Sequence, residues 1–155
     1  MRLALQAGVI IVGAVVLFGC AKAKSMMGMG DPIAERQALM KEQSAAMRAI
    51  QSKLKAGQHQ AITPELDKLA KTSSQIPALF PQGSLDPSRS RAKPEIWQRW
   101  SEFEGNAKRL GEKATQTAAI ARTGTAQATS AAVADLSKTT CGACHTAFRG
   151  PEIKK

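Results

Sequence analysis

The sequence contains no tyrosine, and aromatic residues make up only 4% of its 155 residues. Strands favour aromatic and β-branched residues, whereas helices favour Ala, Leu, Gln, Glu and Lys. Because Ala is abundant and no alternating apolar and polar pattern occurs, an all-β fold is disfavoured and an all-α fold is expected. Large rings usually supply much of the buried area of a core, so another group is expected to fill this one.

Acidic residues are also scarce, with 12 Asp and Glu against 22 Lys and Arg, which gives a formal net charge of +10. Such a balance attracts acidic partners: nucleic acid, anionic lipid or an acidic protein. The basic residues are spread along the chain without interleaved aromatics, so we expect no nucleic-acid partner. Hydrophobic residues at 43% and charged residues at 22% exclude both wholesale disorder and a polytopic membrane protein.

An apolar run at residues 3–19 directly follows Arg2. Its length suits the hydrophobic region of a signal peptide and falls short of the roughly 20 residues of a comfortable membrane span. Residues 1–23 are therefore predicted to be a targeting segment, and residues 24–30 a flexible tether.

Three outcomes remain open for this targeting segment. Residues 17–20 resemble a bacterial lipobox, in which Cys20 would be lipidated and would tether the protein to a membrane. Cleavage after Ala23 would instead give ordinary secretion, and an uncleaved segment would act as an N-terminal anchor. All three outcomes predict a periplasmic location, with lipid anchoring only in the first.

Helix-start and helix-stop residues predict four helices in the remainder. Asp31-Pro32 and Thr63-Pro64 both place a capping residue before a proline, and Gly150-Pro151 is a stop signal. The predicted helices span residues 31–55, 63 to about 77–81, 94–124 and 125–149, with a long loop at 81–93. Together they predict an antiparallel up-down four-helix bundle over residues 31–152.

Each predicted helix carries a stripe of mainly apolar residues at spacings of three and four. The first stripe includes the polar residues Arg36 and Gln43, which indicates that it faces something with polar groups. The four stripes are Ile33, Arg36, Met40, Gln43, Met47, Ile50 and Leu54; Leu66, Leu69, Ile76 and Phe80; Ile96, Trp100, Phe103, Ala107, Leu110, Ala114, Thr117 and Ala121; and Val133, Leu136, Thr140, Cys144 and Ala147.

Residues 141–145 read Cys-Gly-Ala-Cys-His, the attachment sequence of a c-type haem. Cys141 and Cys144 would form thioethers with the haem vinyl groups, and His145 would ligate the iron. A redox dithiol, a zinc site and a disulfide are the alternatives for these residues. No βαβ unit surrounds the motif, and few further zinc ligands exist. One covalent haem c is therefore the predicted cofactor, and it would fill a core that has few aromatics.

The order of these motifs resembles the class II c-type cytochromes, which include the cytochromes c′. The C-x-x-C-H lies on the last of four helices and is followed by Phe148 and Arg149. Residues 36–40, Arg-Gln-Ala-Leu-Met, are similar to the family's Arg-x-x-x-Met/Leu element. The stretches at 76–81 and 93–97 are similar to its low-spin branch. The resemblance implies a haem-containing four-helix bundle that transfers electrons.

The same resemblance implies roles for single residues. His145 would be the fifth iron ligand. Met40 would be the sixth ligand in the low-spin branch, or an unbound cap over an open site in the c′ branch; filling of the core is its plain alternative. Arg36 would lie near a haem propionate, and Arg149 beside the proximal ligand, unless both are simply solvated.

These expectations combine into a periplasmic one-electron carrier that is not an enzyme. The alternative is a five-coordinate haem protein that binds NO or CO. Peroxidase activity is disfavoured because no acid–base histidine is placed near Met40. The expected partners are redox proteins of acidic character, and the chain could be a monomer or a homodimer.

Overall fold

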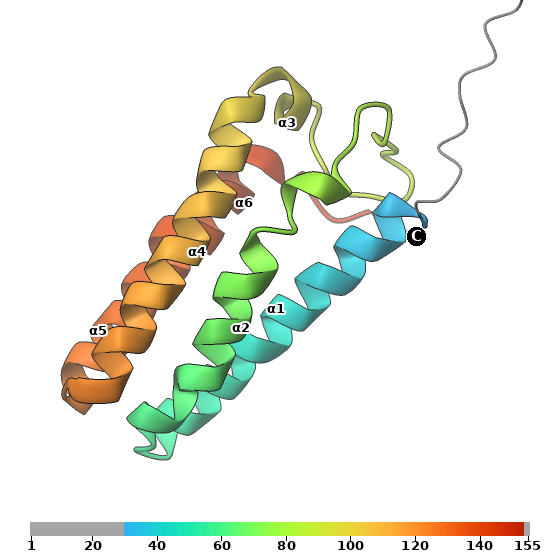
Figure 1. The fold of residues 1–155 in the computed structure, drawn as a ribbon. Helices are drawn as coiled ribbons and strands as arrows, with labels where there is room; N and C mark the ends of the chain where they lie inside the picture. The colour runs from blue at the N-terminus through green and yellow to red at the C-terminus, as the bar shows by residue number, and fades with distance from the viewer. Residues whose placement is uncertain (1–29, 154–155) are drawn as a thin grey trace, which may run out of the picture.

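The computed structural model describes residues 30–153. The secondary-structure elements within these residues are helices and helical turns. Four rods stand side by side (Figure 1), and each packs against the next along the chain. The elements are α1 (Pro32–Lys55), α2 (Thr63–Ser73), α3 (Glu95–Gln98), α4 (Trp100–Thr123), α5 (Ala126–Leu136) and α6 (Ala143–Phe148), with 3₁₀ turns at His59–Ile62 and Pro77–Leu79. The predicted all-α bundle is confirmed.

The predicted targeting segment, the tether at 24–29 and Cys20 lie outside the described residues, so these assignments stay predictions. Within residues 30–153, no helix combines the length and apolar character that a membrane crossing requires.

The start of α1 follows its sequence signals. The Asp31 carboxylate accepts a hydrogen bond of 3.0 Å from the backbone N–H of Ile33, and Pro32 occupies the first turn. The helix ends at Lys55 with Ala56 as its C-cap, and Gly57 follows with a φ of 74°, a conformation that glycine adopts without steric cost. The chain can therefore reverse and run back along α2.

The third predicted helix is divided, because Arg99 leaves the helical conformation with φ −121° and ψ 47°. The short α3 and the long α4 are thus separate elements. The Arg99 guanidinium lies 5.3 Å from the centre of the Phe148 ring, and its Nε donates to Glu102 at 2.9 Å. No proline or glycine marks this break, so the sequence pattern did not predict it.

The fourth rod is not one regular helix either. Between α5 and α6, the residues Ser137–Gly142 form a π-helical segment. There the hydroxyls of Thr139 and Thr140 donate to the carbonyl oxygens of Asp135 and Leu136, at 2.8 and 2.6 Å. Thr117 and Thr129 form the same kind of bond, to the carbonyl oxygen four residues earlier, in α4 and α5. The segment overlaps the first two residues of the C-x-x-C-H motif, Cys141 and Gly142.

The core confirms most of the predicted stripes and changes the first. The residues of the second and third stripes are buried except for half-buried Trp100, although α2 ends at Ser73, earlier than the predicted 77–81, so that Ile76 and Phe80 lie beyond it. On α1, Leu39 and Ala46 are buried although the stripe omits them, whereas Met40 and Met47 are only half-buried. The helix α1 therefore presents one face to α2 and another to a cavity in the bundle.

Candidate functional site

A cavity of about 880 Å³ lies inside the bundle. Its walls come from α1, α4, the loop around residue 90 and the end of the fourth rod, and they include Met40, Met47, Cys141, Cys144 and His145. Pockets that hold small molecules and cofactors have volumes of roughly 300–1,000 Å³. The cavity is therefore large enough for a prosthetic group, and the predicted site residues lie around it.

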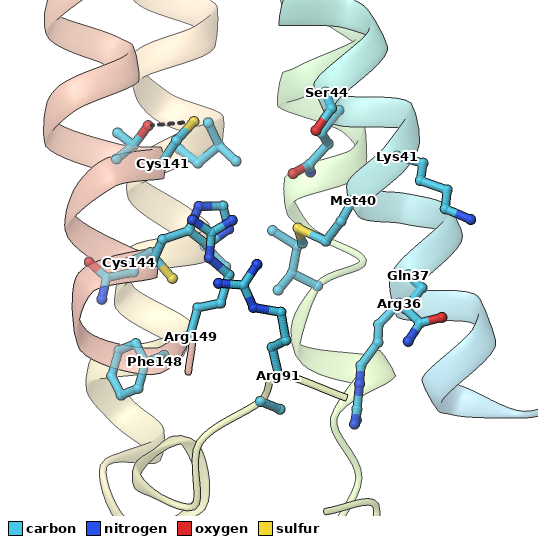
Figure 2. Close-up of a pocket in the computed structure, with 18 of the residues that line it drawn as sticks. Arg36, Gln37, Met40, Lys41, Ser44, Arg91, Cys141, Cys144, Phe148 and Arg149 are labelled. Atoms are coloured by element: carbon cyan, nitrogen blue, oxygen red, sulfur yellow. Dashed lines mark hydrogen bonds between the residues drawn. The ribbon is translucent and has the colours of Figure 1, made fainter. Parts of the chain in front are cut away.

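One wall carries the C-x-x-C-H residues. Cys141 and Cys144 are half-buried free thiols, one from the π-helical segment and the other from α6 (Figure 2). Burial, with a smaller effect of Cys141, raises the pKa of the Cys144 thiol to about 11. Burial also lowers the pKa of His145, and the charges of Arg149 and Arg91 lower it further. At neutral pH, His145 is therefore held as a neutral imidazole, the form that binds a metal.

The opposite wall is α1, and Figure 2 shows Met40 extending from it toward the side that carries Cys144. Met40 is half-buried, and Met47 lines the same cavity two helical turns later. Between them, the Gln43 side chain also lines the cavity and donates to the Thr72 hydroxyl at 3.2 Å. A soft thioether thus lies on the wall facing the thiols, as the sequence indicated.

Arg36 is 3% exposed, and its guanidinium is directed along α1 away from Met40 (Figure 2). It donates to the hydroxyl and the carbonyl oxygen of Ser84, at 3.0 and 2.9 Å, and lies 4.7 Å from the centre of the Phe80 ring. Its Nε is buried and has no hydrogen-bond partner among the described residues. Arg36 also lines the cavity. Its contact with a haem propionate stays a prediction.

Among the other arginines that line the cavity, Arg149 and Arg91 are the two whose charges act on His145. Arg149 is exposed and Arg91 is half-buried, and Figure 2 shows both side chains in the space between the walls. The charges of both lower the pKa of His145, after the larger effect of burial, and the role of Arg149 beside a proximal ligand stays a prediction. Arg91 was not among the predicted site residues. Arg91 lies in a loop, where no helical or strand periodicity indicates which side chains face the interior. Its positive charge was the one sequence feature that could have suggested a role at the site.

The residues present fit a c-type haem. The donor set comprises two thiols for thioether bonds, a neutral imidazole and, across the cavity, a thioether sulfur. The buried, unpartnered Nε of Arg36 suits a carboxylate such as a propionate. Apolar side chains from α4, among them Phe103, Ala107 and Leu110, complete the lining.

Comparisons with known proteins agree with this chemistry. The sequence model of the cytochrome c′ family matches residues 31–149. A cytochrome c-556 from Agrobacterium fabrum is 30% identical over 139 residues, covering 88% of this chain and 92% of the relative. A cytochrome c′ from Rhodopseudomonas palustris is 30% identical over 154 residues, covering 96% of each chain.

Solved structures give the same result for the fold. A cytochrome c′ from Rhodopseudomonas palustris superposes with a TM-score of 0.70 and 26% identity, covering 80% of this chain and 99% of that structure. Another cytochrome c′, described as having an unusual ligand-controlled dimer dissociation, gives a TM-score of 0.71 and 25% identity, with coverage of 80% and 99%. Proteins of this family carry one covalently attached c-type haem and act in electron transfer or gas binding. The chain described here belongs to the cytochrome c′ family of class II c-type cytochromes.

Proposed function

We propose that this cytochrome is a one-electron carrier whose haem is attached through Cys141 and Cys144 and is ligated by His145 and Met40. The observation that carries the proposal is the position of Met40 on the α1 wall, across the cavity from the C-x-x-C-H residues. A bound haem supplies a one-electron couple, and Met/His ligation raises its reduction potential.

The chain's own residues have separable tasks in this proposal. The two thiols fix the cofactor covalently, so it stays in place even when a coordination bond opens. The neutral imidazole of His145 offers its lone pair on one side of the cavity, and the Met40 sulfur offers a soft ligand on the other. Apolar residues such as Leu110 and Phe103 exclude water from the site, which further tunes the potential.

Optical spectra of the purified oxidised and reduced protein test this ligation. A low-spin, six-coordinate spectrum that CO changes only slowly is expected. A high-spin reduced protein that binds CO at once would favour the second candidate, a five-coordinate haem protein for NO or CO. That candidate draws support from the related cytochrome c′ whose dimer dissociation is ligand-controlled, since Met40 could also remain unbound above the haem.

A periplasmic location is part of the proposal. Cytochrome c′ family proteins are periplasmic, and residues 1–23 of this chain have the pattern of a targeting segment. We include a lipid anchor at Cys20 as the finer hypothesis. Incorporation of labelled palmitate that disappears in Cys20→Ser supports the anchor, whereas a mature N-terminus at Lys24 contradicts it.

We also propose that an acidic redox protein docks at the mouth of the cavity. Five exposed or half-buried cations line the cavity alongside one carboxylate, Glu152; the cations are Lys41, Arg48, Arg89, Arg91 and Arg149. Lys41 and Arg48 are seven residues apart on α1 and so share a face. Complementary charge at such a site raises association rates more than it raises affinity.

Reversal of the charges of two cavity-lining cations is expected to slow the reaction of the protein with an anionic oxidant. At low ionic strength, the ferrous Lys41→Glu/Arg48→Glu variant should react with ferricyanide roughly tenfold more slowly than the wild type, because the local potential attracts anions less. Stopped-flow absorbance measures the rate. The matched control is Lys68→Glu/Lys71→Glu, which changes the net charge equally on α2, away from this cavity. Equal slowing by both variants contradicts a localised docking surface.

A further inference from the structure

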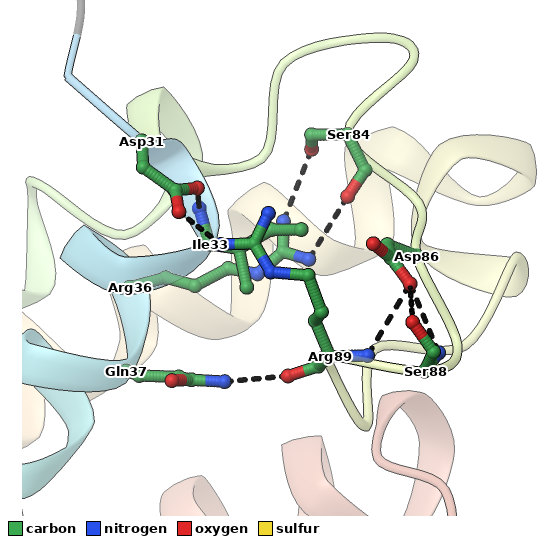
Figure 3. A network of polar contacts seen from close by, with 8 residues as sticks. All are labelled: Asp31, Ile33, Arg36, Gln37, Ser84, Asp86, Ser88 and Arg89. Carbon is green, nitrogen blue, oxygen red and sulfur yellow. Dashed lines mark hydrogen bonds and ion pairs between the residues drawn. The ribbon is translucent and has the colours of Figure 1, made fainter.

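The loop at residues 84–93, here called the strap, is attached to the beginning of α1. Figure 3 shows the contacts: the Arg36 guanidinium donates to the Ser84 hydroxyl and carbonyl oxygen, and the Gln37 amide donates to the Arg89 carbonyl oxygen at 2.6 Å. The Arg89 guanidinium forms an ion pair with Asp31, the N-cap of the same helix. These attachments use the side chains of Arg36 and Gln37 in α1 and of its N-cap, Asp31.

The middle of the strap has a defined shape of its own. The Asp86 carboxylate accepts hydrogen bonds from the backbone N–H groups of Ser88 and Arg89, at 2.9 and 3.2 Å, and from the Ser88 hydroxyl at 2.6 Å. Local bonds of this kind fix a turn that would otherwise sample many conformations. Because the turn is fixed, the strap can hold its two ends at a set distance from each other.

The far end of the strap is attached to the end of α6. The backbone N–H of Lys93 donates to the Phe148 carbonyl at 3.1 Å, and that of Gly150 donates to the Arg91 carbonyl at 2.7 Å. The Lys93 ammonium and the Arg91 guanidinium add bonds of 2.9 Å to the carbonyl oxygens of Ala147 and Gly150. His145 lies in this same short helix.

The two ends of the strap are attached to α1 and to the end of α6, which lie on opposite sides of the cavity. The helix α1 makes its extensive helix contacts with α2, and α6 makes its own with the π-helical segment, α3 and α4. Residues 89–92 of the strap also line the cavity between α1 and α6. The chain thus bridges the two walls that carry Met40 and His145.

We propose that Arg36 and Gln37 are positioning residues, which hold Met40 over the cavity through the strap and so restrict the entry of external ligands. They lie four and three residues before Met40, which is about one helical turn. Fixing them to the strap, and the strap to α6, fixes the separation of the two walls. The inference extends the proposed function, because the wall it holds carries the proposed sixth ligand.

The test measures CO binding to the ferrous holoprotein after flash photolysis or rapid mixing. Arg36→Met removes the two donors to Ser84, and the rate of CO binding should rise about tenfold through the loss of charge-assisted hydrogen bonds. Arg36→Lys keeps the positive charge but has one donor nitrogen in place of the two that reach Ser84, so its rate should fall between this variant and the wild type. The double variant Gln37→Ala/Arg89→Gln alters only exposed side chains, so it tests the strap even where Arg36→Met folds poorly.

The control is Arg122→Gln, which removes an interhelical ion pair to Asp67 away from the cavity. It should leave the CO rate unchanged, and haem staining should be equal in all variants. If the wild type is low-spin but the strap variants bind CO at its rate, the positioning role is wrong and the proposed ligation stands. If the wild type is high-spin but the strap variants still accelerate CO entry, Met40 ligation is wrong and the strap stands.

Discussion

Haem is expected to remain on the wild-type polypeptide through denaturing electrophoresis and to be lost from the Cys141→Ala/Cys144→Ala variant. Both thiols line one cavity, so both can reach a single cofactor there, and thioether bonds survive denaturation whereas coordination bonds do not. Haem staining of the gel measures the difference, which should be nearly complete. Each single variant can keep at most one covalent bond and should retain the stain partially.

The matched control for attachment is Met40→Ala. A sixth ligand contributes no covalent bond, so this variant should stain as strongly as the wild type. Acid-acetone extraction gives an independent readout, because it removes haem that is held only by coordination. If extraction strips the haem from matured wild-type protein, covalent attachment through Cys141 and Cys144 is wrong.

Substitution of Met40 by Ala is expected to convert the haem from low-spin to high-spin and to open it to CO. A distal ligand that is bound 99% of the time lowers the apparent affinity for an external ligand about 100-fold, and removal of that ligand restores it. Absorbance spectra with and without CO, together with a CO titration, measure both effects. The substitution also leaves the attachment residues intact, so the haem content should not change.

Met47→Ala is the matched control, because Met47 lies on the same helix and lines the same cavity. It should remain low-spin and bind CO as the wild type does. If Met47→Ala changes the spectrum as much as Met40→Ala does, the sixth-ligand assignment fails. If the ferrous wild type is already high-spin and ignores the Met40 substitution, Met40 is only a steric cap, and gas binding becomes the better interpretation.

The attachment residues could be predicted because their chemistry depends on neighbours in the sequence. Cys141, Cys144 and His145 lie within five consecutive residues, and that spacing alone indicates a c-type haem. The structure places all three around one cavity, while their roles as attachment and ligand residues remain the predictions that the variants above address.

The burial pattern of α1 shows where periodicity alone is insufficient. A single stripe with spacings of three and four assumes that a helix has one buried face. Here Leu39 and Ala46 are buried in the protein core, while Met40 and Met47 face the cavity, so the helix has two inward faces. The sequence could place Met40 inside the bundle but could not separate contact with protein from contact with a cofactor.

The strap could not be predicted because its partners are distant in the sequence. Arg36 and Ser84 are separated by 48 residues, and the attachments to α6 are largely between backbone atoms. No spacing rule links such groups, so residues 81–93 were expected only to be a loop. For the same reason, the sequence drew attention to Arg36 as a polar member of an apolar stripe without indicating its Ser84 partner.

The π-helical segment separates the orientation of α6, which carries Cys144 and His145, from that of α5. Each residue of an α-helix turns the chain by about 100°, so one residue accommodated in a wider turn changes the azimuth of everything that follows. Val133 and Leu136 on α5 pack into the core, and Cys144 on α6 lines the cavity, although all three belong to one rod. The packing of α5 and the placement of the C-x-x-C-H residues can therefore be adjusted separately, by inserting or deleting a residue between 137 and 140, which leaves the C-x-x-C-H spacing intact.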